Sequence, residues 1–215
     1  MSSMSPSDLR QALNLRQAIK MFDSSRMIPS DTWHALEESM WLTPSSYNTQ
    51  PWKFLVITDE ELKIQLRAQA FKQPQVEDCS HLVVFCSLKS MDRSWIDRLM
   101  SLTAKARGVT PESLSGYGDL IAKDILGERK EQVNEISTRH CFLAMGSLMA
   151  NAAALGLDSC PIEGFRHEKF DEILGLQSTP WRTSLICAVG YRDQRQSTTI
   201  LPRVRFPKEE IIEHR

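Results

Sequence analysis

The sequence predicts an α+β protein built as one domain around a single central sheet. Helical and strand patterns are interleaved along its 215 residues, but without the strict strand–helix–strand alternation of a parallel α/β fold. The runs at residues 81–87 and 183–189 are continuous and apolar, as expected of strands buried on both faces. No repeat, low-complexity tract or linker divides the chain, so we expect residues 1–215 to form one domain.

The first half of the chain carries signals for two helices before any strand. Ser5 followed by Pro6 suits a helix start, and helical spacing of apolar residues continues to about Leu15. Ser30 and Asp31 begin a second helix. The patterns that follow predict a strand over residues 53–58, a helix over 60–70 and the buried strand over 81–87.

The second half opens with residues 89–130, a charged stretch with the weakest core pattern of the chain. We expect two surface helices there, near residues 92–107 and 111–126. Residues 132–155 predict a long helix, amphipathic at first and apolar on most sides later, which Gly156 ends. A short helix over 167–174 and the strand over 183–189 come next, before a proline-spaced tail from residue 197 that is not expected to be helical.

Charge and hydropathy exclude several classes of function. The formal net charge is −1, so nothing draws the chain toward nucleic acid or an anionic membrane. The longest uncharged stretch, residues 141–157, contains Ser147 and Asn151 and predicts a buried helix rather than a membrane span. No signal-peptide pattern opens the sequence.

The five cysteines are scattered, odd in number and set mostly in apolar runs. This usage predicts reduced, buried thiols in a cytoplasmic protein rather than a disulfide framework. No Cys-x-x-Cys or His-x-x-x-His spacing occurs, so no metal site is expected. Dinucleotide-binding, P-loop and nucleophile-elbow motifs are also missing from the sequence.

The segment at residues 44–52, Pro-Ser-Ser-Tyr-Asn-Thr-Gln-Pro-Trp, is the most informative of the chain. Pro44 and Pro51 restrict the backbone at its two ends. Between them Ser45, Ser46 and Asn48 offer neutral donors and acceptors. A rigid, neutral, polar loop suits a planar heteroaromatic ligand with a hydroxylated chain. An ordinary helix-to-strand connection is the alternative, because turn residues are common in loops.

Basic residues gather at the two ends of the sequence. Arg16 and Lys20 lie near the start, and Arg203 and Arg205 lie near the end. The two late arginines alternate in an extended run, so their side chains point to the same side and suit a bidentate anion clamp. Solvated surface charge is the alternative interpretation.

A turn after the long helix adds a third feature, Pro161-Ile162-Glu163-Gly164. A tight turn there exposes backbone N–H groups, which can stabilise negative charge on the edge of a ring. Taken alone it is an unremarkable turn. Together with the polar loop and the basic ends, it makes a monophosphorylated planar cofactor the most economical account.

Five collinear motifs carry a resemblance. They are RQAIKMFD at 16–23, PSSYNTQPWKF at 44–54, SHLVVFC at 80–86, AALGLDSCPIEGF at 153–165 and LPRVRFP at 201–207. With them the sequence resembles the FMN-dependent nitroreductase family, and within it the bacterial oxygen-insensitive NAD(P)H nitroreductase and dihydropteridine reductase branch.

The resemblance implies a fold and an assembly. The fold is a mixed central sheet flanked by helices, in an intertwined homodimer with two FMN molecules at the subunit interface. Residues 132–155 would then form dimer core, residues 89–130 a variable lid, and residues 197–215 an arm onto the partner subunit.

The resemblance also implies roles for individual residues. Arg16, Arg203 and Arg205 would bind the FMN phosphate, and Lys20 would approach the pyrimidine side of the flavin. The backbone N–H groups of Glu163 and Gly164 would face N5 and O4 of the flavin. The remaining cofactor-binding positions implied are Gln17 and Ala18, Pro44, Ser45, Ser46 and Asn48 from the other subunit, Lys72, Gln73 and Gln75 at the pyrimidine edge, and Pro161 and Ile162 on the ring face.

The sequence departs from the family pattern at three places. Ala18 stands where a serine often binds FMN, which removes one hydrogen bond. The segment at residues 71–75 is shorter than in well-known relatives. The aromatic lid expected near residues 117–124 has only Tyr117.

The reaction implied is ping-pong oxidoreduction. NADPH or NADH would pass a hydride to flavin N5, and a small electron-poor acceptor such as a nitroaromatic, a quinone or a pterin would then take it. No side chain need act as an acid, because water can deliver the second proton. The alternatives are another flavin reaction on the same fold (enone reduction, dehalogenation or flavin fragmentation) and a non-catalytic flavin-binding protein.

Overall fold

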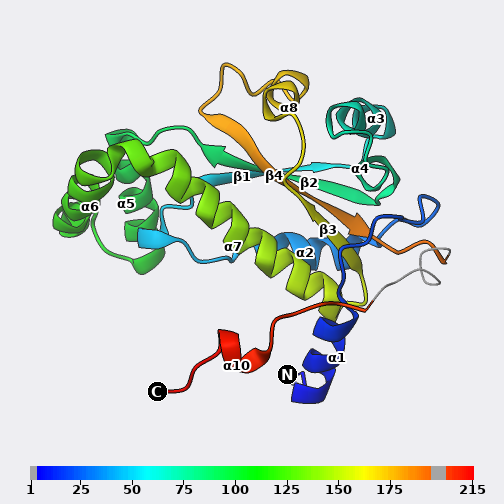
Figure 1. The fold of residues 1–215 in the computed structure, drawn as a ribbon. Coiled ribbons are helices and arrows are strands. Elements are labelled where there is room, and N and C mark those ends of the chain that lie inside the picture. Colours follow the sequence, from blue (N-terminus) through cyan, green and yellow to red (C-terminus); the bar gives the residue numbers. More distant parts are fainter. Residues whose placement is uncertain (1–3, 195–201) are drawn as a thin grey trace.

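A computed structural model describes residues 4–194 and 202–215 (Figure 1). Four strands form one sheet in the order β1-β2-β4-β3. They are β1 (Trp52–Ile57), β2 (His81–Leu88), β3 (Asp158–Ile162) and β4 (Trp181–Gly190). Every neighbouring pair is antiparallel. Among the described residues, the one parallel pairing is an isolated bridge between Ala18 and Ser159, so the sheet becomes mixed only where residue 18 joins its edge.

Helices cover both faces of this sheet (Figure 1). On one face α3 (Glu60–Gln69), α4 (Gln75–Asp78) and α8 (His167–Ile173) enclose a core with the alternate β2 residues Leu82, Val84 and Cys86. On the other, α2 (Ser30–Trp41) and α7 (Val133–Ala154) pack on Val83 and Phe85. β2 is buried at every position, and its residues 82–86 form a continuous apolar run, as expected of a strand with both faces covered.

The remaining elements are short or lie at the rim. The helices are α1 (Pro6–Leu15), α5 (Arg93–Arg107), α6 (Ser115–Ala122) and α10 (Lys208–Ile211), with 3₁₀ turns η1 (Ser46–Asn48), η2 (Pro111–Leu114) and η4 (Lys130–Gln132) and a π-helical turn η3 (Lys123–Glu128). Of the helices in the described residues, none has both the length and the apolar character that a membrane span requires.

Residues 89–130 differ from the expectation of two surface helices. The first predicted helix is present as α5, but the second is divided into η2, α6 and η3. The division at η3 has a local cause: the Arg129 N–H reaches back five residues to the Asp124 carbonyl at 2.8 Å, and the two side chains form an ion pair. This region also has its own apolar cluster, including Ile96, Ile121 and Ile125, rather than a weak core.

The sequence analysis was incomplete at two further elements. It did not assign β3, because Asp-Ser-Cys-Pro lacks a strand signature; the strand tolerates Pro161 because it lies at the sheet edge. It expected no helix in the tail, yet α10 follows Pro207. The tail is non-helical over residues 202–207, and residues 197–201 of the predicted arm lie outside the described residues.

Two smaller expectations are confirmed. Gly156 ends α7 in a left-handed conformation with φ 73°, and the Leu157 N–H closes the helix on the Ala152 carbonyl at 2.8 Å. All five cysteines are buried and unbonded to one another.

Candidate functional site

Three arginines meet at the C-terminal end of α1. Arg203 donates from Nη1 to the carbonyls of Leu13 and Arg16 at 3.0 and 3.2 Å, and from Nη2 to Asn14 at 2.8 Å. It therefore caps the carbonyls that the end of a helix leaves unpaired. Burial, and then the charges of Arg203 and Arg205, lower the pKa of Arg16. Across residues 4–194 and 202–215 Arg16 has no acidic partner, so the cluster favours a bound anion.

Residues 17–20, called here the strap, continue from Arg16 along the edge strand β3. Ala18 forms the bridge to Ser159, and the Ile19 N–H donates to the Ser159 carbonyl at 3.3 Å. Ile19 is buried, so its neighbours Ala18 and Lys20 are turned outward. Lys20 Nζ lies 3.5 Å from Cys160 Sγ. The structure thus brings Lys20 against Cys160 in the middle of β3, three residues before the turn at Glu163.

Cys160 accepts this contact as a neutral thiol. Burial raises its pKa, and Lys20 opposes that rise. Gln75 Nε2 also approaches Cys160 Sγ, at 3.9 Å. Both side chains are held at the sheet edge by a sulfur that sequence reasoning had treated only as a buried thiol.

The segment at residues 71–75 reaches the same turn. Gln75 Nε2 donates to Gln73 Oε1 at 2.9 Å, and Gln73 Nε2 donates to the Gly164 carbonyl at 2.9 Å. Gln75 is only 1% exposed. Lys72 is exposed, and within the described residues its side chain makes no contact with this turn. Gln73 and Gln75 therefore point toward the turn after β3, and Lys72 points into solvent.

The turn itself presents an open face. Glu163 and Gly164 are exposed just beyond β3, while Ile162 is buried and Pro161 half-buried. The Phe165 N–H donates to the Glu163 carbonyl at 3.1 Å, which closes a three-residue turn centred on Gly164. In the described part of the chain, the N–H groups of residues 163 and 164 enter no turn or side-chain hydrogen bond. A Cβ on Gly164 would meet only Phe71, at 4.0 Å, so the space over this turn is free.

The loop at residues 44–52 is ordered and conformationally costly. Tyr47, Asn48 and Gln50 have φ values of 54°, 56° and 46°, a region that costs a non-glycine residue roughly 1–2 kcal/mol. Hydrogen bonds inside the loop offset part of this cost, including one from the Gln50 N–H to Ser45 Oγ at 2.9 Å.

Three side chains from other elements hold the loop from outside. The Ser46 N–H donates to His140 Nε2 of α7 at 3.0 Å. Tyr47 donates to Asp124 of η3 at 2.8 Å, and Trp95 of α5 donates from Nε1 to the Thr49 carbonyl at 2.8 Å. Sequence reasoning missed these residues, because a histidine in an apolar helix or an aspartate in a charged stretch carries no local signature.

The loop and the arginine cluster lie at opposite ends of the sheet. Trp52, directly after the loop, pairs with Ser87 at one end of β2. Ser159, beside the strap, pairs with Val189, which pairs with His81 at the other end. From His81 to Ser87 the strand runs roughly 20 Å, at about 3.3 Å per residue. The predicted residues Pro44, Ser45, Ser46 and Asn48 are therefore not joined to the other predicted site residues within this chain.

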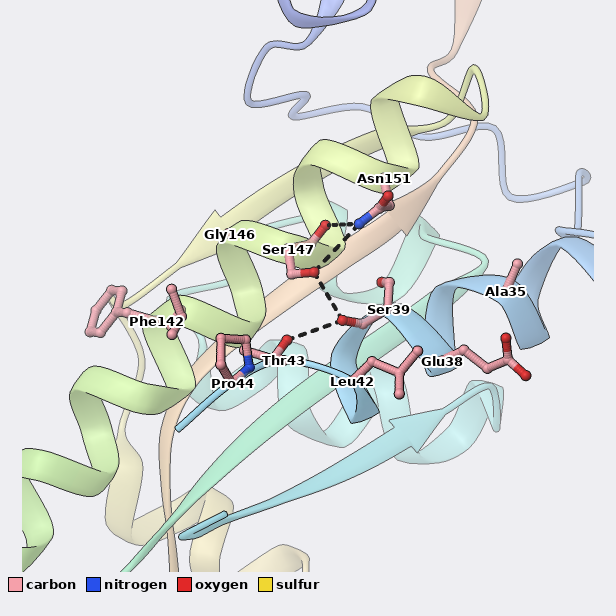
Figure 2. A pocket seen from close by; sticks show the side chains of 11 residues that line it. Ala35, Glu38, Ser39, Leu42, Thr43, Pro44, Phe142, Gly146, Ser147 and Asn151 are labelled. Carbon is pink, nitrogen blue, oxygen red and sulfur yellow. Dashed lines mark hydrogen bonds between the residues drawn. The ribbon is translucent and has the colours of Figure 1, made fainter. Parts of the chain in front are cut away.

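A broad groove lies beside the loop, between α2 and α7 (Figure 2). Its volume is about 640 Å³. The Ser39 carbonyl accepts hydrogen bonds from Thr43 and from Ser147, which ties the two helices together at its floor. Leu42, Phe142 and Leu143 line it and are 67%, 38% and 49% exposed. An apolar surface of this kind on two packed helices is typical of an interaction site.

The sequence model of the nitroreductase family matches residues 13–191. The chain belongs to the nitroreductase family. A nitroreductase family relative, the oxygen-insensitive NAD(P)H nitroreductase of Salmonella typhimurium, is 30% identical over 205 residues, which cover 92% of this chain and 94% of the relative. The branch expected from the motifs is confirmed by this match.

Solved nitroreductases share the fold. A protein of Exiguobacterium sibiricum described as a nitroreductase in complex with FMN has 26% identity and a TM-score of 0.76, with 100% of this chain and 99% of that chain covered. A nitroreductase-like protein of Streptococcus mutans has a TM-score of 0.83 at 21% identity, covering 98% and 99% of the two chains.

Proposed function

We propose that this nitroreductase family member is an FMN-dependent NAD(P)H oxidoreductase that reduces small electron-poor acceptors such as nitroaromatics, quinones and pterins. One observation carries the proposal. The cluster of Arg16, Arg203 and Arg205 leads along a short strap to Lys20 and to the open backbone amides of residues 163 and 164. This order of groups matches a cofactor with a phosphate at one end and an electron-accepting ring at the other.

The residues present fit FMN on structural grounds. Three like charges are crowded with too few acidic partners, which a phosphate would relieve. The face over Gly164 is free of side chains, which leaves room for a flat ring. Pro161 and Ile162 would support that ring from behind, and Gln17 and Ala18 lie on the strap between phosphate and ring.

When bound, FMN supplies hydride acceptance from NADPH or NADH at N5 and hydride delivery to the acceptor. The chain supplies position and charge. Lys20, which lies against Cys160, would stabilise negative charge on the pyrimidine side, and Gln75, which approaches the same sulfur, would lie at the ring edge. The amides of Glu163 and Gly164 would donate toward N5 and O4. No carboxylate or imidazole is required as an acid, since solvent reaches the open face of the turn.

The loop at residues 44–52 would complete the pocket of a second copy. Within one chain it lies at the far end of the sheet, so Ser45, Ser46 and Asn48 reach a flavin only if two chains associate. The groove between α2 and α7 offers an apolar surface for that association (Figure 2). The tail offers a second one, since Val204 and Phe206 are 86% and 76% exposed. We therefore infer an intertwined homodimer, with the tail as an arm onto the partner.

The acceptor would enter from the side of residues 89–130. A cavity of about 450 Å³ lies between the loop and α5, lined among others by Asn48, Leu99 and Tyr117. Its size suits a small aromatic molecule.

The nicotinamide donor and the reduced state of the five cysteines fit the cytoplasm.

Anaerobic reduction of the purified, FMN-loaded protein tests the function. NADPH or NADH should bleach the flavin absorbance, and nitrofurazone or menadione should restore it. A protein that takes up no FMN contradicts the proposal. A bound flavin that neither donor bleaches would instead indicate a non-catalytic flavin-binding protein.

A further inference from the structure

An imidazole of α7 accepts a hydrogen bond from a backbone N–H of the polar loop. The loop holds three non-glycine residues in the left-handed region, so surrounding contacts must stabilise its conformation. Asp124 accepts a hydrogen bond from the Tyr47 hydroxyl, and Trp95 donates one to the Thr49 carbonyl near the end of the loop. His140 alone, among these three, accepts from a loop N–H, and it does so at Ser46, one of the residues assigned to the cofactor.

The geometry fixes the protonation state of His140. A backbone N–H can only donate, so His140 Nε2 must accept; the neutral ring then carries its proton on Nδ1, which is buried and has no hydrogen-bond partner among the described residues. Ser46 Oγ lies 3.3 Å from the same nitrogen. The ring is 8% exposed and stands edge-on to Trp52 at a centroid distance of 6.2 Å. A second proton would have to be placed on Nε2, where it would oppose the Ser46 N–H.

We propose that His140 is a positioning residue of the flavin site, which as a neutral acceptor holds the loop at residues 44–52 in its flavin-binding conformation and releases it when protonated. The inference rests on the proposed function, because it assigns Ser45 and Ser46 to FMN. His140 itself touches no cofactor; it acts through Ser46.

The sign of the pH effect follows from the ring's surroundings. Burial lowers the pKa of His140 below its ordinary value of 6.5; the backbone of Ile136, one turn earlier in α7, acts in the opposite direction, and the positive charge of Arg129 lowers the pKa further. Trp52 and Ser46, which contact the ring, are uncharged, and Arg129 is itself paired with Asp124. The protein with the loop held therefore binds fewer protons at His140 than the protein with the loop released, in which the exposed imidazole would return toward its ordinary pKa of about 6.5. Acid below about pH 6.5 favours release.

FMN titration of the flavin-free protein at pH values from 8 to 5 tests this, with three variants. H140Q keeps a neutral acceptor, H140L removes it, and H167Q is the matched control, since His167 lies on α8 with Nδ1 3.1 Å from the Thr183 carbonyl. The wild type and H167Q should lose FMN affinity as the pH falls. Acid also protonates the FMN phosphate, whose second pKa is about 6, so every protein should bind FMN more weakly there. H140Q should lose less affinity than the wild type between pH 8 and pH 5, and H140L should bind about tenfold more weakly than H140Q at every pH.

A second measurement does not need the cofactor. Hydrogen–deuterium exchange of the peptide containing residues 45–50 should rise in acid for the wild type relative to H140Q at the same pH. Parallel pH profiles of wild type and H140Q in either measurement would overturn the proposal. If FMN binding fails in every protein while exchange behaves as stated, the proposed function fails but the role of His140 in holding the loop stands.

Discussion

Arg203 and Arg205 share one extended segment but have different surroundings. Arg203 binds three carbonyls at the end of α1, so it is a structural as well as an electrostatic residue. Arg205 bonds only to the carbonyl of its neighbour Val204, at 2.7 Å, among the contacts of the described residues. Arg203 would therefore help to build the proposed anion site, whereas the guanidinium of Arg205 would be available to bind the anion.

The pair makes a direct prediction. Arg205→Ala should weaken FMN binding by tenfold to about a hundredfold, because a hydrogen bond to a charged group contributes roughly 1.5–3 kcal/mol. Its melting temperature and its turnover when saturated with FMN should stay near wild type. Arg203→Ala should weaken binding and also lower the melting temperature. Fluorescence titration with FMN and thermal unfolding measure both quantities, and an equal loss of saturated turnover in Arg205→Ala would contradict a phosphate-binding role.

At the scale of elements, the strap between Arg16 and Lys20 is held in place by the residues that follow it. Residues 21–23 pair with residues 191–193: the Asp23 N–H donates to the Tyr191 carbonyl at 2.9 Å, and the Asp193 N–H to the Met21 carbonyl at 3.0 Å. Phe22 then packs against the end of β4 at Gly190. A Cβ on Gly190 would lie 2.9 Å from the Phe22 ring and 3.1 Å from the Ser80 nitrogen.

Gly190→Ala should therefore displace the strap. We expect a loss of about 1–3 kcal/mol in the free energy of unfolding, as for other overpacked sites, together with weaker FMN binding. Gly116→Ala is the control, because a Cβ there meets nothing within 4 Å and alanine is the better residue in a helix. Urea unfolding measures both variants. An unchanged Gly190→Ala protein would show that the strap has room to move.

The elements that the sequence predicted are those with a strong period or a terminal signal. Ser5, Gly156 and the apolar runs of β2 and β4 placed helix ends and buried strands close to where the structure has them. The π-helical turn was not predictable, because it depends on an ion pair between Asp124 and Arg129 that acts only in three dimensions. At the site, the motifs predicted Arg16, Lys20 and Gln75 as neighbours of one region. They gave no signal for His140, whose role depends on a loop 94 residues away in sequence.

At the scale of the whole molecule, the proposed FMN site would draw on two parts of the chain that lie apart along the sheet. The strap beside Ser159 lies level with one end of β2 and the polar loop before Trp52 with the other, while the turn after Ile162 lies level with Val84 in the middle of β2. Two-fold association would place the loop of one chain against the cluster of its partner, twice over. The central claim is therefore that each FMN site is built from two chains.

Complementation between two defective variants tests that claim most directly. One variant carries Arg203→Glu with Arg205→Glu, and the other carries Ser45→Trp in the loop; each alone should bind no FMN. In dimers co-expressed with two tags, half of the molecules are mixed, and each mixed dimer has one intact site. FMN binding should thus return to about a quarter of the wild-type number of sites in the unfractionated population, and to about half in mixed dimers purified through both tags. No recovery in purified mixed dimers would mean that each site lies within one chain, and would contradict the account.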